Sequence, residues 1–171
     1  YFELFGLPVD FDVDEKTLHR KYLSLTRSVH PDVAGQASQE KRHDALAISS
    51  EMNRAYETLR DPVLRAEYLL SLSGEPITPD DRAVSADLLA QVMMIREEIE
   101  DARQAEDQVG LTDLKQQVAT KQSACMESIV SLSRSLAEKN PDTRRVLRQQ
   151  LNAIKYWNNL MDRLLPGGDS A

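Results

Sequence analysis

The tripeptide His30-Pro31-Asp32 places an imidazole and a carboxylate on either side of a proline, and it is the most distinctive chemical signal in the chain. Proline disfavours helical geometry in the residue before it, so a helix that reaches His30 is predicted to end there. The stiff turn would then project both side chains from a loop. The alternative is a helix stop whose polar side chains have no further role, and the tripeptide alone leaves both interpretations open.

Cationic side chains come directly before this motif, on a helix predicted to run from the N-cap Asp14 to Val29. Apolar residues at spacings of three and four share one face of this helix: Leu18, Tyr22, Leu25 and Val29. The basic residues Lys16, Arg20 and Arg27 fall on the opposite face, with Lys21 at its flank and Leu23 among them. A cationic helix face suits an acidic partner surface, and the alternative is an ordinary solvated face.

A second pattern lies on the predicted helix 81–103. Four of its residues already form a complete core stripe: Leu88, Val92, Ile95 and Ile99. Leu89 and Met93 lie outside this stripe, and Glu97 and Glu100 fall beside them. This arrangement indicates either a groove for a partner protein or a second face that the last helix of the chain covers.

The sequence contains no recognisable enzyme site. It has no glycine-rich phosphate loop and no motif that pairs a Ser or Cys nucleophile with a histidine. The three histidines lack zinc-binding spacing, and the single cysteine, Cys125, lies on a predicted core stripe. We therefore expect a protein that is not an enzyme and that has no cofactor and no metal site.

Composition and charge restrict the partners further. The net charge of −7 disfavours general nucleic-acid binding. Residues 75–110 carry 10 acidic and 3 basic groups, and such a segment is usually a solvated helix face. No apolar run is long enough to cross a membrane, and the first residues do not resemble a signal peptide. A single cysteine fits a reducing compartment.

Every long segment has helical periodicity and none alternates like a strand, which predicts an all-α protein. The Pro- and Gly-containing segment 71–80 indicates a boundary between domains 1–74 and 75–171. The other predicted helices cover 39–59, 62–72, 111–138 and 141–165. The helices 39–59, 111–138 and 141–165 have, in that order, the apolar stripes Ala45, Ile48, Met52, Ala55 and Leu59; Leu111, Leu114, Val118, Cys125, Ile129, Leu132 and Leu136; and Leu147, Leu151, Ile154, Met161 and Leu165.

Several further segments carry a family resemblance. They are Tyr1-Phe2-Glu3-Leu4-Phe5-Gly6-Leu7-Pro8, Asn53-Arg54-Ala55-Tyr56-Glu57-Thr58-Leu59, Asp61-Pro62, Arg65-Ala66-Glu67-Tyr68-Leu69-Leu70 and Arg96-Glu97-Glu98. Together with His30-Pro31-Asp32 and the basic helix, they resemble the HscB-type J-domain co-chaperones of iron–sulfur cluster assembly. The resemblance covers essentially the whole chain and is strongest over residues 1–72. It implies an L-shaped, all-α fold, in which an N-terminal J-domain (an antiparallel helical hairpin with flanking short helices) precedes a C-terminal three-helix bundle.

The resemblance also implies two sets of binding residues. J-domains stimulate ATP hydrolysis by a DnaK-type chaperone, which owns the catalytic residues, and the matching chaperone-binding positions are His30, Pro31, Asp32, Arg20, Lys21 and Arg27. The positions matching the family's surface for an IscU-type scaffold protein are Leu89, Ala90, Met93, Met94, Glu97 and Tyr156. Three residues depart from the usual pattern: Val33 replaces a frequent lysine, and Ala90 and Met94 replace bulky apolar and acidic residues.

We therefore expect a co-chaperone that stimulates an HscA/DnaK-type ATPase and delivers an IscU-type cluster scaffold to it. We expect neither a nucleic acid nor a membrane as partner. The expected location is the bacterial cytoplasm, or the mitochondrial matrix if the source is eukaryotic. Two alternatives remain, namely a general J-protein with a different client and a non-catalytic helical adaptor.

Overall fold

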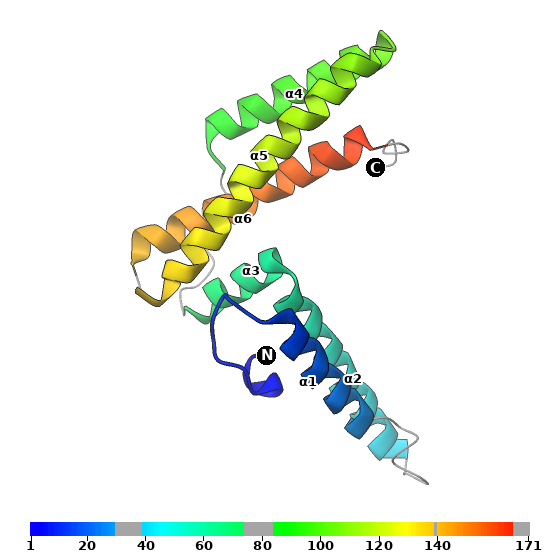
Figure 1. The fold of residues 1–171 in the computed structure, drawn as a ribbon, viewed down its shortest axis with the longest axis vertical. Helices are drawn as coiled ribbons and strands as arrows, with labels where there is room; N and C mark the ends of the chain where they lie inside the picture. The colour runs from blue at the N-terminus through cyan, green and yellow to red at the C-terminus, as the bar shows by residue number, and fades with distance from the viewer. Residues whose placement is uncertain (30–38, 74–83, 139, 166–171) are drawn as a thin grey trace. The chain divides into compact units, whose positions relative to one another are not determined.

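The computed structural model describes residues 1–29, 39–73, 84–138 and 140–165, and within these ranges all regular structure is helical, as predicted. Contacts within the chain divide it into two compact units, Tyr1–Leu72 and Ser73–Ala171. Figure 1 shows both units, which are described separately below. The predicted motif His30-Pro31-Asp32 and the neighbouring Val33 lie outside the described residues.

The first unit contains η1 (Glu3–Phe5), α1 (Glu15–Val29), α2 (Gln39–Arg60) and α3 (Pro62–Leu72). Helix α1 begins where predicted, because the Asp14 carboxylate accepts a 2.9 Å hydrogen bond from the Thr17 backbone N–H. The Thr17 hydroxyl and this N–H hold the pKa of Asp14 below its ordinary value. Helix α3 begins in the same way, with Asp61 accepting from Val63 N–H at 2.8 Å and Pro62 at the first helical position.

The core of the first unit joins the amino-terminal segment to α1 and α2. Its buried residues are Phe2, Phe5, Leu18, Ala55 and Leu59, and partly buried side chains packed against them include Leu7, Tyr22, Leu25, Tyr68 and Leu69. The predicted stripe of α2 is confirmed at Met52, Ala55 and Leu59 but is wrong at Ile48, which is 49% exposed. Spacing identifies the face of a helix that can be buried, but not how far along the helix its partner extends.

One buried charge, Arg65, was not predicted from the sequence, and this residue is only 6% exposed. Its Nη1 donates a 2.7 Å hydrogen bond to the Leu59 carbonyl near the end of α2. Its guanidinium also lies 4.9 Å from the ring centroid of Phe11, which is 4% exposed. Arg65 thus binds a carbonyl at the end of α2 and fixes the segment before α1 against α3.

A fragment of residues 1–74 is expected to fold by itself, because the first unit contains its own buried core. Circular dichroism of this fragment should show a helical spectrum and a cooperative thermal transition. A fragment of residues 75–171 is the matched partner and should also be helical. An unfolded 1–74 fragment would contradict the prediction.

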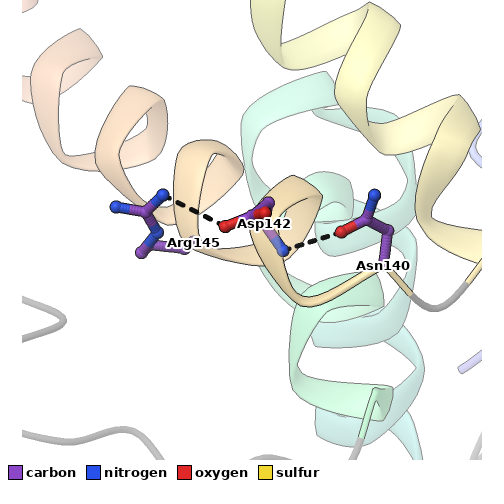
Figure 2. Close-up of polar contacts among 3 residues, drawn as sticks. All are labelled: Asn140, Asp142 and Arg145. Carbon is purple, nitrogen blue, oxygen red and sulfur yellow. Dashed lines mark hydrogen bonds and ion pairs between the residues drawn. The ribbon is translucent and has the colours of Figure 1, made fainter.

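The second unit is a three-helix bundle of α4 (Ala86–Gln104), α5 (Gln108–Arg134) and α6 (Pro141–Leu164), with a 3-10 turn η4 (Ser135–Glu138) after α5. Helix α4 begins later than the predicted residue 81, because Ser85 Oγ accepts the Leu88 N–H at 3.1 Å and caps the helix. Helix α6 begins as predicted. Asn140 Oδ1 accepts from Asp142 N at 2.9 Å, and Asp142 pairs with Arg145 at 3.1 Å. Figure 2 draws both contacts.

On α6, the buried residues of the bundle core cover more of the helix surface than the single predicted stripe. Leu147, Leu151 and Ile154 are buried as predicted, whereas Leu165 is 43% exposed. Ala153, Trp157 and Leu160 are buried instead, because α6 packs against both α4 and α5. Cys125 lies in this core as predicted, and burial raises the pKa of its thiol to about 11.

The turn between α4 and α5 contains a backbone conformation that suits glycine. Glu106 has φ of 54°, and two hydrogen bonds close the turn: Glu106 N to Arg103 O at 3.0 Å and Asp107 N to Ala102 O at 2.8 Å. This is a Schellman motif with glutamate at the left-handed position where glycine is usual.

Glu106→Gly is therefore expected to stabilise the protein by about 0.5–1 kcal/mol, because it removes the left-handed strain of a residue that has a Cβ. Chemical denaturation of the full chain measures the change. Ala105→Gly is the matched control, since Ala105 has a right-handed φ of −82° and this substitution should destabilise. Stabilisation by both substitutions, or by neither, would contradict the strain argument.

Among the described residues, no helix is long and apolar enough to cross a membrane. In the same part of the chain, no group of three or more His, Cys, Asp or Glu side chains is arranged to hold a metal ion.

Candidate functional site

The first candidate surface is the cationic face of α1. Arg20 and Arg27 are both exposed and lie two helical turns apart, which is about 10 Å along the axis. Lys16 is exposed on the same face, and Leu23 is 39% exposed beside them. This face therefore presents the cations Arg20 and Arg27 around the apolar side chain of Leu23. The helix that carries them precedes His30 in the sequence.

The predicted cations of α1 differ in their hydrogen-bond partners. Arg20 Nη2 donates to Thr17 Oγ1 at 2.9 Å, which holds its guanidinium along the helix surface. Lys21 Nζ instead donates to the Gly6 carbonyl at 2.8 Å. Gly6 has φ of 55°, and a Cβ there would lie 3.4 Å from Lys21 Nζ. Lys21 therefore fixes the amino-terminal segment, whereas Arg20 and Arg27 face solvent.

Polar aromatic contacts hold α1 against α2. The rings of Tyr22 and Tyr56 stack with centroids 4.2 Å apart. The Tyr22 hydroxyl donates to Asn53 Oδ1 at 2.9 Å, and His19 Nδ1 and the Tyr56 hydroxyl form a 3.0 Å hydrogen bond. No role was predicted for His19 from the sequence. The available signal was that His19 and Tyr22 on one helix have the same i, i+3 spacing as Asn53 and Tyr56 on the other. This network keeps the cationic face of α1 in a fixed orientation.

The second candidate surface lies on the outer side of α4. Leu89 is 40% exposed, Met93 is 64% exposed and Met94 is 51% exposed. The core of the bundle is filled from the other side of the same helix by Ile95 and Ile99, each 1% exposed. The alternative in which the last helix buries Leu89 and Met93 is therefore wrong. Ala90 and Glu97 are exposed on the same helix.

Contacts on both flanks of α4 fix the direction of this outer side. On one flank, Lys121 Nζ of α5 donates to Gln91 Oε1 at 3.1 Å. On the other flank, Arg163 of α6 lies 3.6 Å from Glu100, and Arg103 donates a short hydrogen bond to the Arg163 carbonyl. Glu100 is thus paired within the bundle.

Tyr156 of α6, one of the positions matched to the scaffold surface, is partly buried. Helices α4 and α6 both run antiparallel to α5 and therefore run in the same direction (Figure 1). Tyr156 precedes Arg163 by seven residues, just as Met93 precedes Glu100. Since Arg163 contacts Glu100, the common two-turn step places Tyr156 at the level of Met93.

Comparison with known proteins matches each unit to a family model. Residues 1–68 match the DnaJ domain, and residues 84–164 match the HSCB C-terminal oligomerisation domain. The solved structure of chaperone HscB from Vibrio cholerae is 31% identical with a TM-score of 0.77, over 96% of this chain and 94% of that chain. The chain belongs to the HscB family.

Eukaryotic HscB relatives have the same fold. The crystal structure of human co-chaperone protein HscB is 28% identical with a TM-score of 0.78, over 96% of this chain and 79% of that chain. The Jac1 co-chaperone from Saccharomyces cerevisiae is 25% identical with a TM-score of 0.66, over 97% of this chain and 94% of that chain.

A curated relative, the co-chaperone protein HscB homolog of Vibrio cholerae serotype O1, is 41% identical over 101 residues. That match covers 58% of this chain and spans only 59% of the relative's length. The HscB family consists of J-domain co-chaperones that are not enzymes. The sequence predicted this class of protein.

Proposed function

We propose that this protein stimulates the ATPase of an HscA/DnaK-type chaperone and delivers an IscU-type iron–sulfur cluster scaffold protein to it. The observation that carries the proposal is the presence of two exposed surfaces of unlike chemistry on two separate compact units. One surface is cationic and lies on α1, and the other is apolar and lies on α4.

The chaperone-binding part would be the J-domain, residues 1–74. Arg20 and Arg27 would attract an acidic chaperone surface and fix the register of docking, and His30-Pro31-Asp32 would then act on the ATPase cycle. Lys21 would contribute less, because its ammonium is bound to the Gly6 carbonyl. The catalytic groups for ATP hydrolysis would belong to the chaperone.

The scaffold-binding part would be the bundle, residues 75–171. Leu89 and Met93 would supply apolar anchors, Tyr156 would supply an aromatic one, and the rim would include Ala90, Met94 and Glu97. Interfaces concentrate their energy in a few such anchors that lie within a polar rim. Glu97 is expected to affect the association rate more than the lifetime of the complex.

The relatives above come from a bacterium, from human and from yeast. We place this protein in the bacterial cytoplasm, with the mitochondrial matrix as the location if its source is eukaryotic. The single cysteine fits a reducing compartment in either case.

An ATPase turnover assay tests the proposal. An HscA-type or DnaK-type chaperone is measured alone, with this protein, with an IscU-type scaffold, and with both. Stimulation that rises more than additively with both proteins would support the proposal. Stimulation without any effect of the scaffold would favour a general J-protein with another client, and no stimulation would favour a helical adaptor.

Arg27→Ala is expected to weaken ATPase stimulation most strongly at low salt, because the exposed cation acts over a distance that salt shortens from about 30 Å at 0.01 M to about 10 Å at 0.1 M. The salt dependence of stimulation measures this effect. Arg54→Ala removes another exposed cation of the same unit, from α2, where it pairs with Glu51 at 3.7 Å. That control should leave the salt dependence unchanged, and equal losses in both variants would contradict a specific role for Arg27.

A further inference from the structure

The five methionines of the chain fall into two groups by exposure. Met93 is 64% exposed and Met94 is 51% exposed, both on the outer side of α4. Met52 is 2% exposed in the first unit, and Met126 and Met161 are partly buried in the bundle. The two most exposed methionines of the protein are thus adjacent residues on one surface.

The other side chains that oxidants attack readily are shielded. Cys125, the single cysteine, is 5% exposed. Burial raises the pKa of its thiol to about 11, so it is almost entirely protonated and unreactive near neutral pH. Trp157 is also only 5% exposed. We therefore expect oxidation of the folded protein to occur first at Met93 and Met94.

We infer that Met93 and Met94 form a reversible oxidation site through which a peroxide-class oxidant releases the apolar partner of the α4 surface. This inference rests on the scaffold-binding role proposed above and adds a means of regulating it. In the reaction, the thioether sulfur attacks one oxygen of hydrogen peroxide and the O–O bond breaks. The products are one sulfoxide and one water, so sulfur loses two electrons and the peroxide gains two.

Oxidation changes the chemistry of the surface without changing its backbone. A sulfoxide is polar and accepts hydrogen bonds, so a partner that buries it must remove its water. The neighbouring apolar anchor Leu89 cannot be oxidised and remains in place. A dithiol-dependent methionine sulfoxide reductase would restore the thioether, releasing water and forming a disulfide. Because α4 is fixed by contacts on both flanks, the fold should survive the modification.

The test treats the full-length protein with increasing hydrogen peroxide and follows three quantities. Peptide mass mapping locates the sulfoxides, titration measures affinity for an IscU-type scaffold, and the turnover assay measures stimulation without scaffold. We expect sulfoxides at Met93 and Met94 before Met52, Met126 and Met161. The scaffold affinity should fall by about tenfold or more as an anchor becomes polar, with unchanged scaffold-independent stimulation and recovery after reductase treatment.

Two variants make the assignment specific. For Met93→Leu/Met94→Leu, the ratio of affinities before and after peroxide should be close to one, because leucine has no thioether. For Met161→Leu, the ratio should equal that of the unmodified sequence. A peroxide response that persists in the double variant would overturn the inference.

Each remaining outcome also has a defined meaning. First oxidation at Met52, Met126, Met161 or Cys125 would overturn the assignment of the site, and sulfoxides without loss of affinity would overturn the regulatory role. If the untreated protein does not bind the scaffold, the proposed delivery function fails and the regulatory role fails with it. Mass mapping alone would then still decide whether Met93 and Met94 are the preferred modification site.

Discussion

The variant His30→Gln is expected to reduce ATPase stimulation to the rate of the chaperone alone. The resemblance to J-domains assigns the action on the chaperone to His30-Pro31-Asp32, and glutamine cannot reproduce the geometry or the charge of the imidazole. The sequence predicts a loop at this position. We therefore expect the free energy of unfolding to change by no more than about 0.5 kcal/mol, as is usual for a substitution outside a packed core.

The measurement is single-turnover ATP hydrolysis by the chaperone, together with a thermal melt of the variant. Affinity for the scaffold provides an internal control, because the proposed scaffold surface belongs to the other unit. It should remain equal to that of the unmodified protein. Normal stimulation by His30→Gln would show that the motif has no functional role here, and loss of scaffold binding together with stimulation would indicate a folding defect.

Three truncations on the apolar surface are expected to have the second large effect. Leu89→Ala, Met93→Ala and Tyr156→Ala should each weaken scaffold binding by about 2 kcal/mol, a roughly 30-fold loss of affinity. The triple variant should show no measurable binding. Calorimetric or fluorescence titration gives the affinities, and scaffold-independent ATPase stimulation should survive all three changes.

Exposure predicts the stability of these variants. Leu89 and Met93 are 40% and 64% exposed, so their truncation leaves no closed cavity and should lower the melting temperature little. Ile95→Ala, at a position on the same helix that is 1% exposed, should instead cost about 2–5 kcal/mol of stability.

Val109→Ala is the matched surface control, since Val109 is 72% exposed and is not part of the proposed surface. It should leave affinity unchanged. Full scaffold affinity in the triple variant, or an equal loss of affinity in Val109→Ala, would contradict the proposed surface. Because Tyr156 is partly buried, its melting curve decides whether a loss of affinity there reflects contact or misfolding.

Local chemistry allowed the sequence to predict most helix boundaries. Asp14 was predicted as an N-cap, and its carboxylate accepts a backbone N–H in the first turn of α1. The amide oxygen of Asn140 caps the predicted start of α6 in the same way. Proline at the first helical position marked the starts of α3 and α6. Capping was misjudged at two helix starts. Helix α4 begins after the cap Ser85 rather than at residue 81, and α5 begins at Gln108 after the cap Asp107 rather than at residue 111. Helix α5 ends at Arg134, before the 3-10 turn η4, rather than at residue 138.

The sequence predicted which residues could form the candidate surfaces, but not whether other parts of the fold cover or bind them. Spacing placed Leu89 and Met93 off the core stripe of α4, yet it left open whether α6 covers them. The exposed fractions decide that point, because they depend on how three helices cross. Lys21 likewise shares a helix with Arg20, but only the fold brings it to the Gly6 carbonyl.

The sequence by itself determined the helical class, the apolar face of each helix, most of the caps and the family resemblance, because these depend on residues within a few positions of one another. The tertiary structure decided how far burial extends along α2, why Phe2, Phe11 and Arg65 are buried, and how His19 meets Tyr56. These features join residues distant in sequence, and a local period of three to four residues says nothing about which distant segment comes to lie against a helix.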